Sequence, residues 1–229
     1  MNYSTILVFA AHPDDEIRMA GTMAKLSAAG VQVFVCQYTN GSEGYPRPEW
    51  RDKIVEMRIK EADACNAVLG ITKRYMVGRD DMALVNDKET FLETIRIIRE
   101  VRPDAIFTHG PEDFHRDHRA TCELSIEAAW QAGEPVAAQL GEPHVTPHVF
   151  YYKGVRSRLP DLIYDVSDFA HKTQEALAVQ ESQHTLFGRT REDFLAEAER
   201  IKKAVAEGRK YTESFWFTDR CHINDFPPV

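Results

Sequence analysis

The chain has 229 residues, of which 43% are hydrophobic and 28% are charged, a composition typical of a single globular domain over residues 1–229. Its formal net charge of -8 argues against a general nucleic-acid binder, which would usually be basic. The first apolar run, of about six residues, is too short for a signal sequence or a membrane span. We therefore expect a cytoplasmic protein with no membrane partner. The four cysteines lie far apart, which favours buried free thiols.

The first half of the chain alternates between strand and helix patterns. Apolar, β-branched runs predict strands, and apolar residues at helical spacing that end at glycine or proline predict helices. The predicted elements are a strand at 5–11, a helix at 19–29, a strand at 31–36, a helix at 51–69, a strand at 73–77, a helix at 90–101 and a strand at 104–108. This alternation predicts an α/β fold with a doubly wound, mainly parallel, Rossmann-like sheet and helices on both faces.

The second half of the chain has less regular patterns. It predicts a helix at 119–131, a surface loop at 133–147, strands at 149–152 and 162–166, helices at 168–181 and 191–207, and an extended aromatic segment at 211–217. We expect the aromatic residues of 211–217 to serve as core or as a subunit contact. The sequence contains no repeat and no domain linker.

Three adjacent acids directly follow the first predicted strand. The stretch His12-Pro13-Asp14-Asp15-Glu16 ends an apolar run, although neighbouring carboxylates repel one another. Such a stretch is either a well-solvated loop or the binding site of a cation. In a doubly wound sheet, the loop after the first strand opens onto the crevice where ligands bind.

A second polar loop follows the strand predicted at 104–108. Three of the nine histidines, His109, His115 and His118, fall within ten residues here, together with Asp113 and Asp117. Both loops follow strands of one parallel sheet, so we expect them to meet at the same crevice. Two histidines and a carboxylate around a divalent metal, with one position left for water, form a catalytic zinc site. No GxGxxG or GxxxxGK[ST] motif indicates a nucleotide site.

The motif of residues 10–16, followed far downstream by His115-Arg116-Asp117-His118, resembles the LmbE/PIG-L family of zinc-dependent N-acetylglucosaminyl deacetylases. Arg58 and Glu61 resemble that family's R-x-x-E helix. The segments 171–183 and 211–215 resemble its late helix and its C-terminal segment. Arg18 and Met19 depart from the pattern, since small or apolar residues are commoner just after the motif.

The resemblance implies a role for each motif residue. It places the metal ligands on His12, Asp15 and His118, and implies one Zn²⁺ per chain, with other divalent metals open. It places the general base on Asp14, and a transition-state stabiliser on His115 that Asp117 orients and keeps protonated. It places substrate contacts on Arg58 and Asp81.

The implied function is removal of an N-acetyl group from an N-acetylglucosamine-type amino sugar by attack of a zinc-bound water. Asp14 or His115 would protonate the leaving amine. We expect Glu16 to orient a neighbour or cap a helix, and His109 to be loop structure. Since family members are often oligomers, the resemblance leaves a homo-oligomer open.

Three other functions fit parts of the pattern. A member of the same family could cleave a larger amide, such as a thiol-sugar conjugate, and would release an acid larger than acetate. A receiver-like signalling domain also places an acidic pair after its first strand, but that pair holds Mg²⁺ through oxygen ligands. A non-catalytic sugar-binding protein would not need the complete set of acids and histidines.

Overall fold

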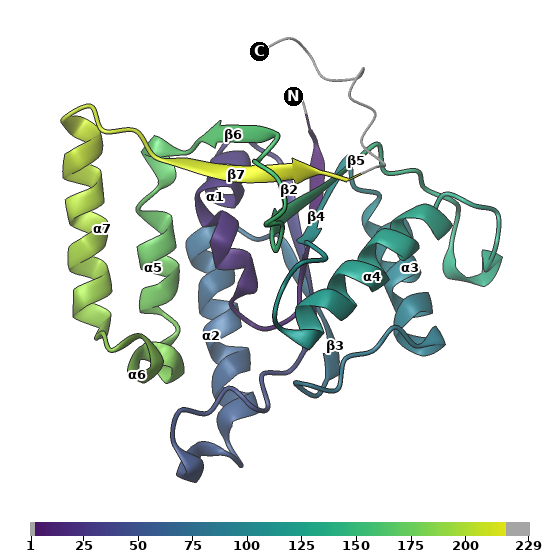
Figure 1. The fold of residues 1–229 in the computed structure, drawn as a ribbon, viewed down its shortest axis with the longest axis horizontal. Helices are drawn as coiled ribbons and strands as arrows, with labels where there is room; N and C mark the ends of the chain where they lie inside the picture. The colour runs from purple at the N-terminus through teal and green to yellow at the C-terminus, as the bar shows by residue number, and fades with distance from the viewer. Residues whose placement is uncertain (1–2, 219–229) are drawn as a thin grey trace.

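The computed structural model describes residues 3–218, and these form an α/β structure around a seven-stranded sheet. The strand order is β3-β2-β1-β4-β5-β7-β6 (Figure 1). The strands are β1 (Thr5–Ala10), β2 (Gln32–Thr39), β3 (Lys73–Arg79), β4 (Ala105–His109), β5 (His148–Lys153), β6 (Leu162–Asp165) and β7 (Thr212–Phe217). The pairs β3–β2, β2–β1, β1–β4 and β4–β5 are parallel, whereas β7 pairs antiparallel with β5 and with β6. The predicted doubly wound, mainly parallel sheet is confirmed.

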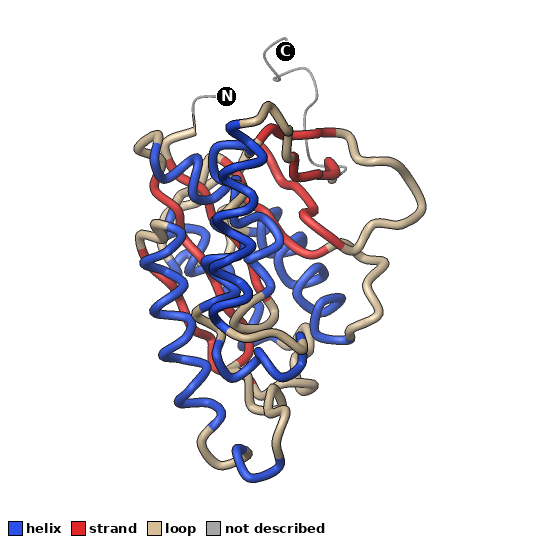
Figure 2. Tube along the Cα trace, turned by 90° about the vertical axis from the view of Figure 1, so that its left-hand side faces the viewer, coloured by secondary structure: helices blue, strands red, loops and turns tan. Residues whose placement is uncertain are grey.

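Helices cover both faces of this sheet. The α-helices are α1 (Ala20–Ala28), α2 (Ile54–Leu69), α3 (Lys88–Val101), α4 (Arg116–Gln131), α5 (Lys172–Ala178), α6 (His184–Phe187) and α7 (Arg191–Ala206). The helices α1, α2 and α5 lie on one face, and α3 and α4 lie on the other (Figure 1). Figure 2, seen from the side of α7 and α5, shows the first helical layer in front of the strands.

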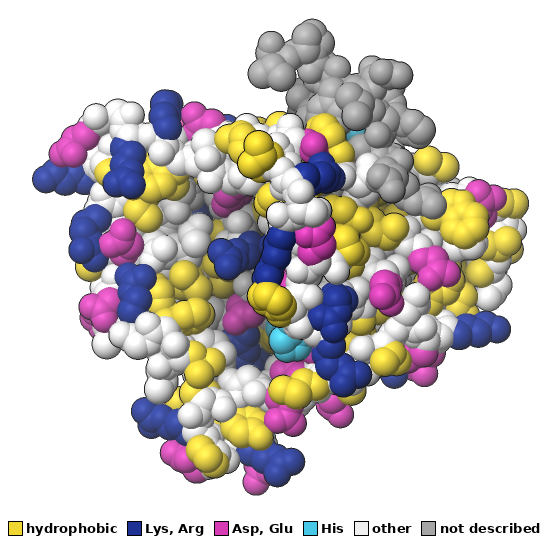
Figure 3. All heavy atoms as spheres, in the orientation of Figure 1, with side chains coloured by type: hydrophobic (Ala, Val, Ile, Leu, Met, Phe, Trp, Pro, Cys, Tyr) yellow, Lys and Arg dark blue, Asp and Glu magenta, His cyan; other side chains and the backbone are white. Residues whose placement is uncertain are grey.

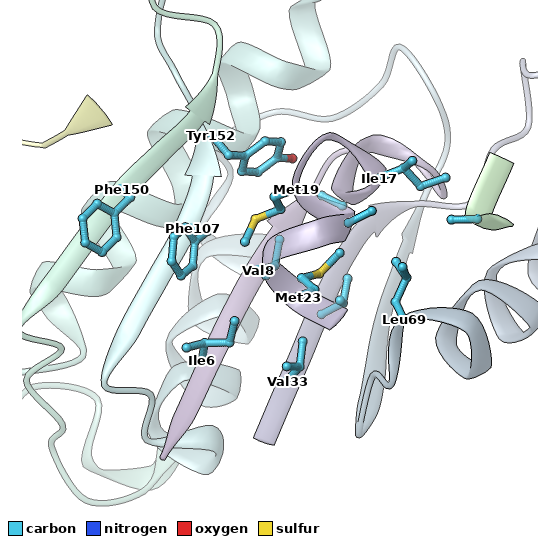
Figure 4. Packing of buried hydrophobic residues seen from close by; sticks show 14 of the residues in the cluster. Ile6, Val8, Ile17, Met19, Met23, Val33, Leu69, Phe107, Phe150 and Tyr152 are labelled. Carbon is cyan, nitrogen blue, oxygen red and sulfur yellow. The ribbon is translucent and has the colours of Figure 1, made fainter. Parts of the chain in front are cut away.

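Alternating residues of β1 pack into two separate cores, as expected for a central strand that is covered on both faces. Ile6 and Val8 point toward α1 and contact the cluster that contains Met19 and Met23 (Figure 4). Leu7 and Phe9 belong to the cluster on the opposite face, which α3 and α4 cover. The two cores fix β1 at the centre, and therefore fix the loop that follows it.

Several predicted boundaries are wrong in ways that affect the site. The helix predicted at 119–131 begins at Arg116, because the side chain of His115 caps it by accepting a hydrogen bond from the Asp117 amide. The helix predicted at 168–181 is broken into a turn, α5 and a second turn (Glu181–Gln183). By contrast, the extended segment predicted at 211–217 is confirmed as β7, and its Phe215 lies in the core.

Within residues 3–218, no helix is long and apolar enough to cross a membrane. Of the four cysteines, Cys36, Cys65 and Cys122 are buried free thiols. Cys221 lies outside the described residues.

Candidate metal centre

Two loops at the carboxyl ends of neighbouring strands carry the candidate residues. The strands β1 and β4 pair in parallel, so the chain leaves both at the same edge of the sheet. After β1 the chain turns into a short 3-10 helix (Asp15–Met19), and after β4 it enters α4. This arrangement brings His12 and Asp15 against His118. The two polar loops therefore meet at one edge of the sheet, as predicted from the sequence.

The donor atoms of these three residues lie close together, with both carboxylate oxygens of Asp15 taking part. His12 Nδ1 lies 3.2 Å from Asp15 Oδ2 and 3.2 Å from His118 Nε2, and His118 Nε2 lies 3.2 Å from Asp15 Oδ1. Ligands of a tetrahedral metal with bonds of about 2.1 Å lie about 3.4 Å from one another. The separations therefore fit three ligands on one face of a metal ion.

Each of the two histidines has a carboxylate beside its other ring nitrogen. His12 Nε2 lies 3.0 Å from Asp117 Oδ2, and His118 Nδ1 lies 3.0 Å from Asp113 Oδ1. Metal-ligating histidines are characteristically held in this way, because the second carboxylate fixes the ring orientation and raises the basicity of the ligating nitrogen. These supporting carboxylates are an independent indication that the nitrogens facing one another are metal donors.

The electrostatics of the site follow from burial and close contacts. Burial lowers the pKa of His12, but hydrogen bonds to Asp117 and Asp15 outweigh it and raise that pKa to about 10. Burial also opposes ionisation of Asp15, yet contacts with His109, His118 and His12 hold its pKa well below the ordinary value. A metal at this site would displace a proton from His12, so binding should release protons.

The candidate donors within residues 3–218 form two overlapping groups. One contains His12, His115 and His118, and the other contains Asp15, His109 and His118, with the donor atoms of each group within 4.8 Å of one another. His118 belongs to both groups. The expected set of His12, Asp15 and His118 draws on both, and its pairwise separations of 3.2 Å fit a metal.

Asp14 has different surroundings from its neighbour Asp15. Its Oδ2 lies 2.8 Å from Arg58 Nη2, and its side chain is 27% exposed. Arg58 is buried and also donates from Nη1 to Glu61 and to Gln180. Asp14 is therefore held in position by Arg58, lines the same cavity as the donor cluster, and stays accessible to solvent.

Arg58 and Glu61 of α2 connect the loop after β1 with the turn that follows α5. All three segments resemble family motifs. Glu61 accepts hydrogen bonds from the amide and the hydroxyl of Ser182, which lies in the Glu181–Gln183 turn. Gln183 in turn donates to the Gly44 carbonyl. The break in the helix predicted at 168–181 has a clear cause, because the turn directs Ser182 toward the carboxylate of Glu61.

Glu16 does not cap the following helix. It is completely buried and forms an ion pair with Arg74, whose guanidinium also donates to Asn66 and Gln37. Two roles were expected for Glu16, to orient a neighbour or to cap the following helix. The second of these, the helix cap, is wrong. Its partner belongs to β3, so the pair anchors the first loop to the adjacent part of the sheet.

The structure brings His115 and Asp117 together, with the backbone amide of Asp117 closer to the ring than its carboxylate. His115 Nδ1 accepts a hydrogen bond from the Asp117 backbone amide, and the nearest carboxylate oxygen of Asp117 lies 3.9 Å away. That carboxylate instead contacts His12 and accepts from the Met82 amide. Burial and the nearby His12 and His118 lower the pKa of His115, and the carboxylate of Asp117 opposes this shift without reversing it.

The two expected substrate contacts have protein partners. The guanidinium of Arg58 contacts Asp14 and Glu61, as described above. The carboxylate of Asp81 accepts hydrogen bonds from the amides of Gly41 and Glu43, and so shapes the loop after β2. Both residues nevertheless line a cavity of about 310 Å³ together with His12, Asp14, Asp15, His115 and His118.

Sequence reasoning missed three contributors to the site. Lys153, the last residue of β5, lies 3.2 Å from Asp15 Oδ1. Asp113 supports His118, and its position five residues before that histidine was the available signal. His109 ends β4 instead of lying in a loop, and it contacts both the Tyr152 hydroxyl and Asp15. Burial lowers the pKa of His109 to about 4, so its ring is neutral.

A mainly parallel sheet with a histidine and carboxylate donor cluster at its carboxyl edge, beside an accessible carboxylate, is an arrangement typical of metal-dependent hydrolases. The family model for PIG-L, described as GlcNAc-PI de-N-acetylase, matches residues 7–129, more than half of the chain. The chain belongs to the PIG-L family. The receiver-like alternative is therefore wrong.

Two curated relatives are named as deacetylases. The diacetylchitobiose deacetylase of Thermococcus kodakarensis is 31% identical over 190 residues, which cover 78% of this chain and 69% of that protein. A 1D-myo-inositol 2-acetamido-2-deoxy-alpha-D-glucopyranoside deacetylase of Catenulispora acidiphila is 31% identical over 173 residues, which cover 63% and 57%. The alignment thus spans less than two thirds of the second relative. Neither name favours the alternative of a larger amide.

The fold also occurs in a solved structure with a different reaction. The 4-carboxy-2-hydroxymuconate hydratase from Pseudomonas putida KT2440 has a TM-score of 0.75 and 23% identity, covering 99% of this chain and 98% of that one. At this identity the likeness concerns the fold alone. The reaction must therefore be argued from the site.

Proposed function

We propose that this protein is a metal-dependent N-deacetylase that hydrolyses the acetamide of an N-acetylglucosamine-type amino sugar. The observation that carries the proposal is the set of 3.2 Å contacts among His12, Asp15 and His118, in which Asp15 takes part through both carboxylate oxygens, beside the accessible carboxylate of Asp14. Membership of the PIG-L family and the names of two relatives support the choice of substrate class.

His12, Asp15 and His118 would hold the metal, and two imidazoles with one carboxylate favour zinc. Bound there, a divalent metal would supply Lewis-acid polarisation of the acetyl carbonyl and lower the pKa of water toward about 7. Asp117 and Asp113 would keep the two histidine rings oriented toward it.

Asp14 is the general base of the proposed reaction. Its carboxylate takes a proton from the attacking water as the oxygen bonds to the acetyl carbon. Arg58 holds that carboxylate at 2.8 Å and limits its rotation. As the carbon–nitrogen bond breaks, the nitrogen receives a proton, and the products are acetate and the free amine.

His115 is the candidate for stabilising the transition state from another side of the cavity. Its side chain is 38% exposed, and its Nδ1 accepts from a backbone amide, so a neutral ring carries its hydrogen on Nε2. That N–H can donate to the developing oxyanion, a contribution of roughly 3–4 kcal/mol in other enzymes. The proton for the amine then comes from Asp14, which received it from water.

Acetate release, measured together with metal content, tests this function. The substrate panel is N-acetylglucosamine, diacetylchitobiose and the N-acetylglucosaminyl inositol, and each reaction is assayed for acetate and for the new amine. We expect equimolar acetate and amine, one divalent metal per chain, and loss of both metal and activity in His12→Ala and His118→Ala. His171→Ala, which removes a histidine beside Glu175 of α5, should retain both. Protein loaded with one metal per chain that releases no acetate from any of these would refute the proposal.

A further inference from the structure

Lys153 contacts the candidate metal centre but lies outside the motifs that predicted it. Its Nζ lies 3.2 Å from Asp15 Oδ1 and 3.9 Å from Asp113 Oδ2. Asp15 is an expected metal ligand, and Asp113 supports the ring of His118. The ammonium group therefore lies between two carboxylates that belong to the same centre.

The backbone of Lys153 is fixed by the pairing of β5 with β4. Lys153 is the last residue of β5, and the register places it opposite His109. The contact between the two chain segments continues past the strand ends, where the Gly110 amide donates to the Lys153 carbonyl at 2.6 Å. The ammonium group therefore reaches Asp15 from a rigid part of the sheet.

The side chain of Lys153 is accessible from solvent. It is 22% exposed and lines a cavity of about 630 Å³ together with Asp14 and Asp15. Figure 3 shows a hollow between the helices α5 and α7 and the middle of the molecule, with basic and acidic side chains inside it. Replacement of the ammonium group therefore leaves both hydrophobic cores intact.

The two carboxylate oxygens of Asp15 have different partners. Oδ2 accepts a hydrogen bond of 2.8 Å from the backbone amide of His12, which is a neutral donor. Oδ1 accepts from the ammonium group of Lys153, which is a charged donor. In other respects the oxygens are alike, since Oδ2 lies 3.2 Å from His12 Nδ1 and Oδ1 lies 3.2 Å from His118 Nε2. Without Lys153, both oxygens would be available to one metal ion.

An ammonium group at Oδ1 makes that oxygen the poorer metal ligand. It draws charge from the oxygen, and a cation held there repels a divalent ion. A metal ion at the centre then bonds to Oδ2 of Asp15 and to the two imidazole nitrogens. Zinc binds well to three such ligands with one position left open, whereas manganese prefers a shell with more oxygen ligands.

We infer that Lys153 is a positioning residue that leaves Asp15 a single oxygen for the metal, and that it thereby makes the centre select zinc over manganese. The inference rests on the metal centre of the proposed function, and it is independent of the substrate. It assigns the choice of metal to a side chain that does not itself bind the metal.

The direct test is the affinity of the purified protein for Zn²⁺ and for Mn²⁺, each measured by competition with a chelating dye. Lys153→Met removes the charge and retains most of the aliphatic chain. We expect this variant to bind both ions more tightly, because the repulsion is lost. The Zn²⁺-to-Mn²⁺ affinity ratio should fall about tenfold, a typical effect of removing a partner of a metal ligand. Since the loss of charge acts on both ions alike, the ratio isolates the change in ligation.

Three further variants separate this role from a general effect of charge. Lys153→Arg keeps a charged donor and should retain the wild-type ratio. Lys153→Gln keeps only a neutral donor and should lower the ratio, which provides a second neutral variant if Lys153→Met does not fold. Lys73→Met is the matched control, because Lys73 also pairs with a carboxylate, that of Glu100, but begins β3 at the opposite edge of the sheet. It should leave both affinities unchanged.

The visible absorption of the protein loaded with Co²⁺ provides a second readout. Tetrahedral cobalt absorbs strongly, whereas cobalt with more ligands absorbs weakly, so we expect weaker absorption in Lys153→Met than in wild type. An unchanged affinity ratio in both neutral variants, or equal absorption in Lys153→Met and wild type, would overturn the inference. A wild type that shows the expected ratios but releases no acetate would refute the proposed reaction and support the role of Lys153. Failure of the wild type to bind any metal would overturn both.

Discussion

The three adjacent acids of the first loop each have a different cationic partner. Asp14 contacts Arg58, Asp15 contacts Lys153 and the histidines, and Glu16 contacts Arg74. These partners come from α2, β5 and β3, which lie far apart in the sequence. The repulsion among neighbouring carboxylates is therefore relieved before any metal binds, and each acid is free to serve one role.

The buried pair of Glu16 and Arg74 gives a prediction about stability. Arg74→Met leaves the Glu16 carboxylate buried and unpaired, so we expect the free energy of unfolding to fall by about 3–5 kcal/mol. The double variant Glu16→Gln/Arg74→Met should recover part of this loss, because no buried charge remains. Urea unfolding measures both.

An exposed pair provides the control for that experiment. Lys60 and Glu56 are 73% and 72% exposed, so Lys60→Met should leave the free energy of unfolding almost unchanged. A loss in Arg74→Met no larger than the loss in Lys60→Met would contradict the assigned role of the buried pair.

Individual roles were predictable where a motif carried them, and unpredictable where only the tertiary structure did. The family motif predicted His12, Asp15 and His118 as one set, and the structure brings these residues together, whereas Lys153 is brought to Asp15 across 138 residues by the pairing of β5 with β4. The surroundings of Asp117 also depend on the tertiary structure, since its Oδ2 lies 3.0 Å from His12 Nε2 and 3.9 Å from His115 Nδ1.

At the scale of elements, β4 and β5 approach each other closely beside the site. A Cβ atom on Gly110 would lie 2.6 Å from the Gly154 carbonyl oxygen and 2.7 Å from that of Lys153. These are backbone atoms at the neighbouring strand's end, so the strands would have to separate. The residues displaced would include His109 and Asp113, which flank the metal centre.

Gly110→Ala should therefore weaken metal binding as well as stability, with a loss of about 1–3 kcal/mol in the free energy of unfolding. Gly30→Ala is the matched comparison, because Gly30 has a φ of +90° and no atoms near its Cβ position. It should lose stability through backbone strain and retain metal affinity. Equal metal affinity in the two variants, measured by competition with a chelating dye, would refute the structural role of Gly110.

The link between β3 and α3 predicts an acid-sensitive contribution to stability. Hydrogen bonds from Tyr75 and Lys73, with Arg96 nearby, lower the pKa of Glu100 from 4.5 to about 2. The native state thus favours the ionised carboxylate. Its contribution is complete above about pH 4.5, the unfolded value, and is lost as the pH falls toward 2.

The difference in free energy of unfolding between Glu100→Gln and wild type should accordingly be larger at about pH 6 than at about pH 2.5. These two pH values lie on either side of the unfolded pKa. Urea unfolding at both pH values measures the difference, and Glu89→Gln, at an 83% exposed position, serves as the control. A difference that is constant with pH would show that the Glu100 carboxylate does not gain stability from these partners.

Element types in the first half were predicted well, because each strand and helix has a regular apolar period there. The second half was harder because tertiary contacts override the local pattern. The Ser182–Glu61 hydrogen bonds break one predicted helix, and antiparallel β7 lies between β5 and β6 although all the preceding pairings are parallel. Neither feature leaves a periodic signal in the sequence.

For the molecule as a whole, a metal would join two segments that are about a hundred residues apart. His12 and Asp15 follow β1, whereas His118 lies in the first turn of α4. A ligand that binds only the folded state stabilises it by about 2.7 kcal/mol when present at about 100 times its Kd. For a chain of this length, we expect chelation to lower the Tm by about 5–10 °C.

Calorimetry of metal-loaded and chelated protein tests this, with metal content measured on both samples. His12→Ala should melt at the same temperature with and without the chelator. Coincident melting of the two wild-type samples, despite proven removal of the metal, would mean that the metal does not bridge these segments.

Two adjacent aspartates divide the work of the proposed site, with Asp15 holding the metal and Asp14 moving the proton. Asparagine retains the size of either side chain, but it is a poor proton acceptor and a weaker zinc ligand than a carboxylate. The decisive measurement is metal content and acetate release on Asp14→Asn and Asp15→Asn, purified side by side. We predict that Asp14→Asn keeps one metal per chain and loses about 10²–10⁴ in kcat, and that Asp15→Asn loses the metal. Near wild-type turnover in Asp14→Asn, or equal loss of metal in both variants, would contradict this division of roles.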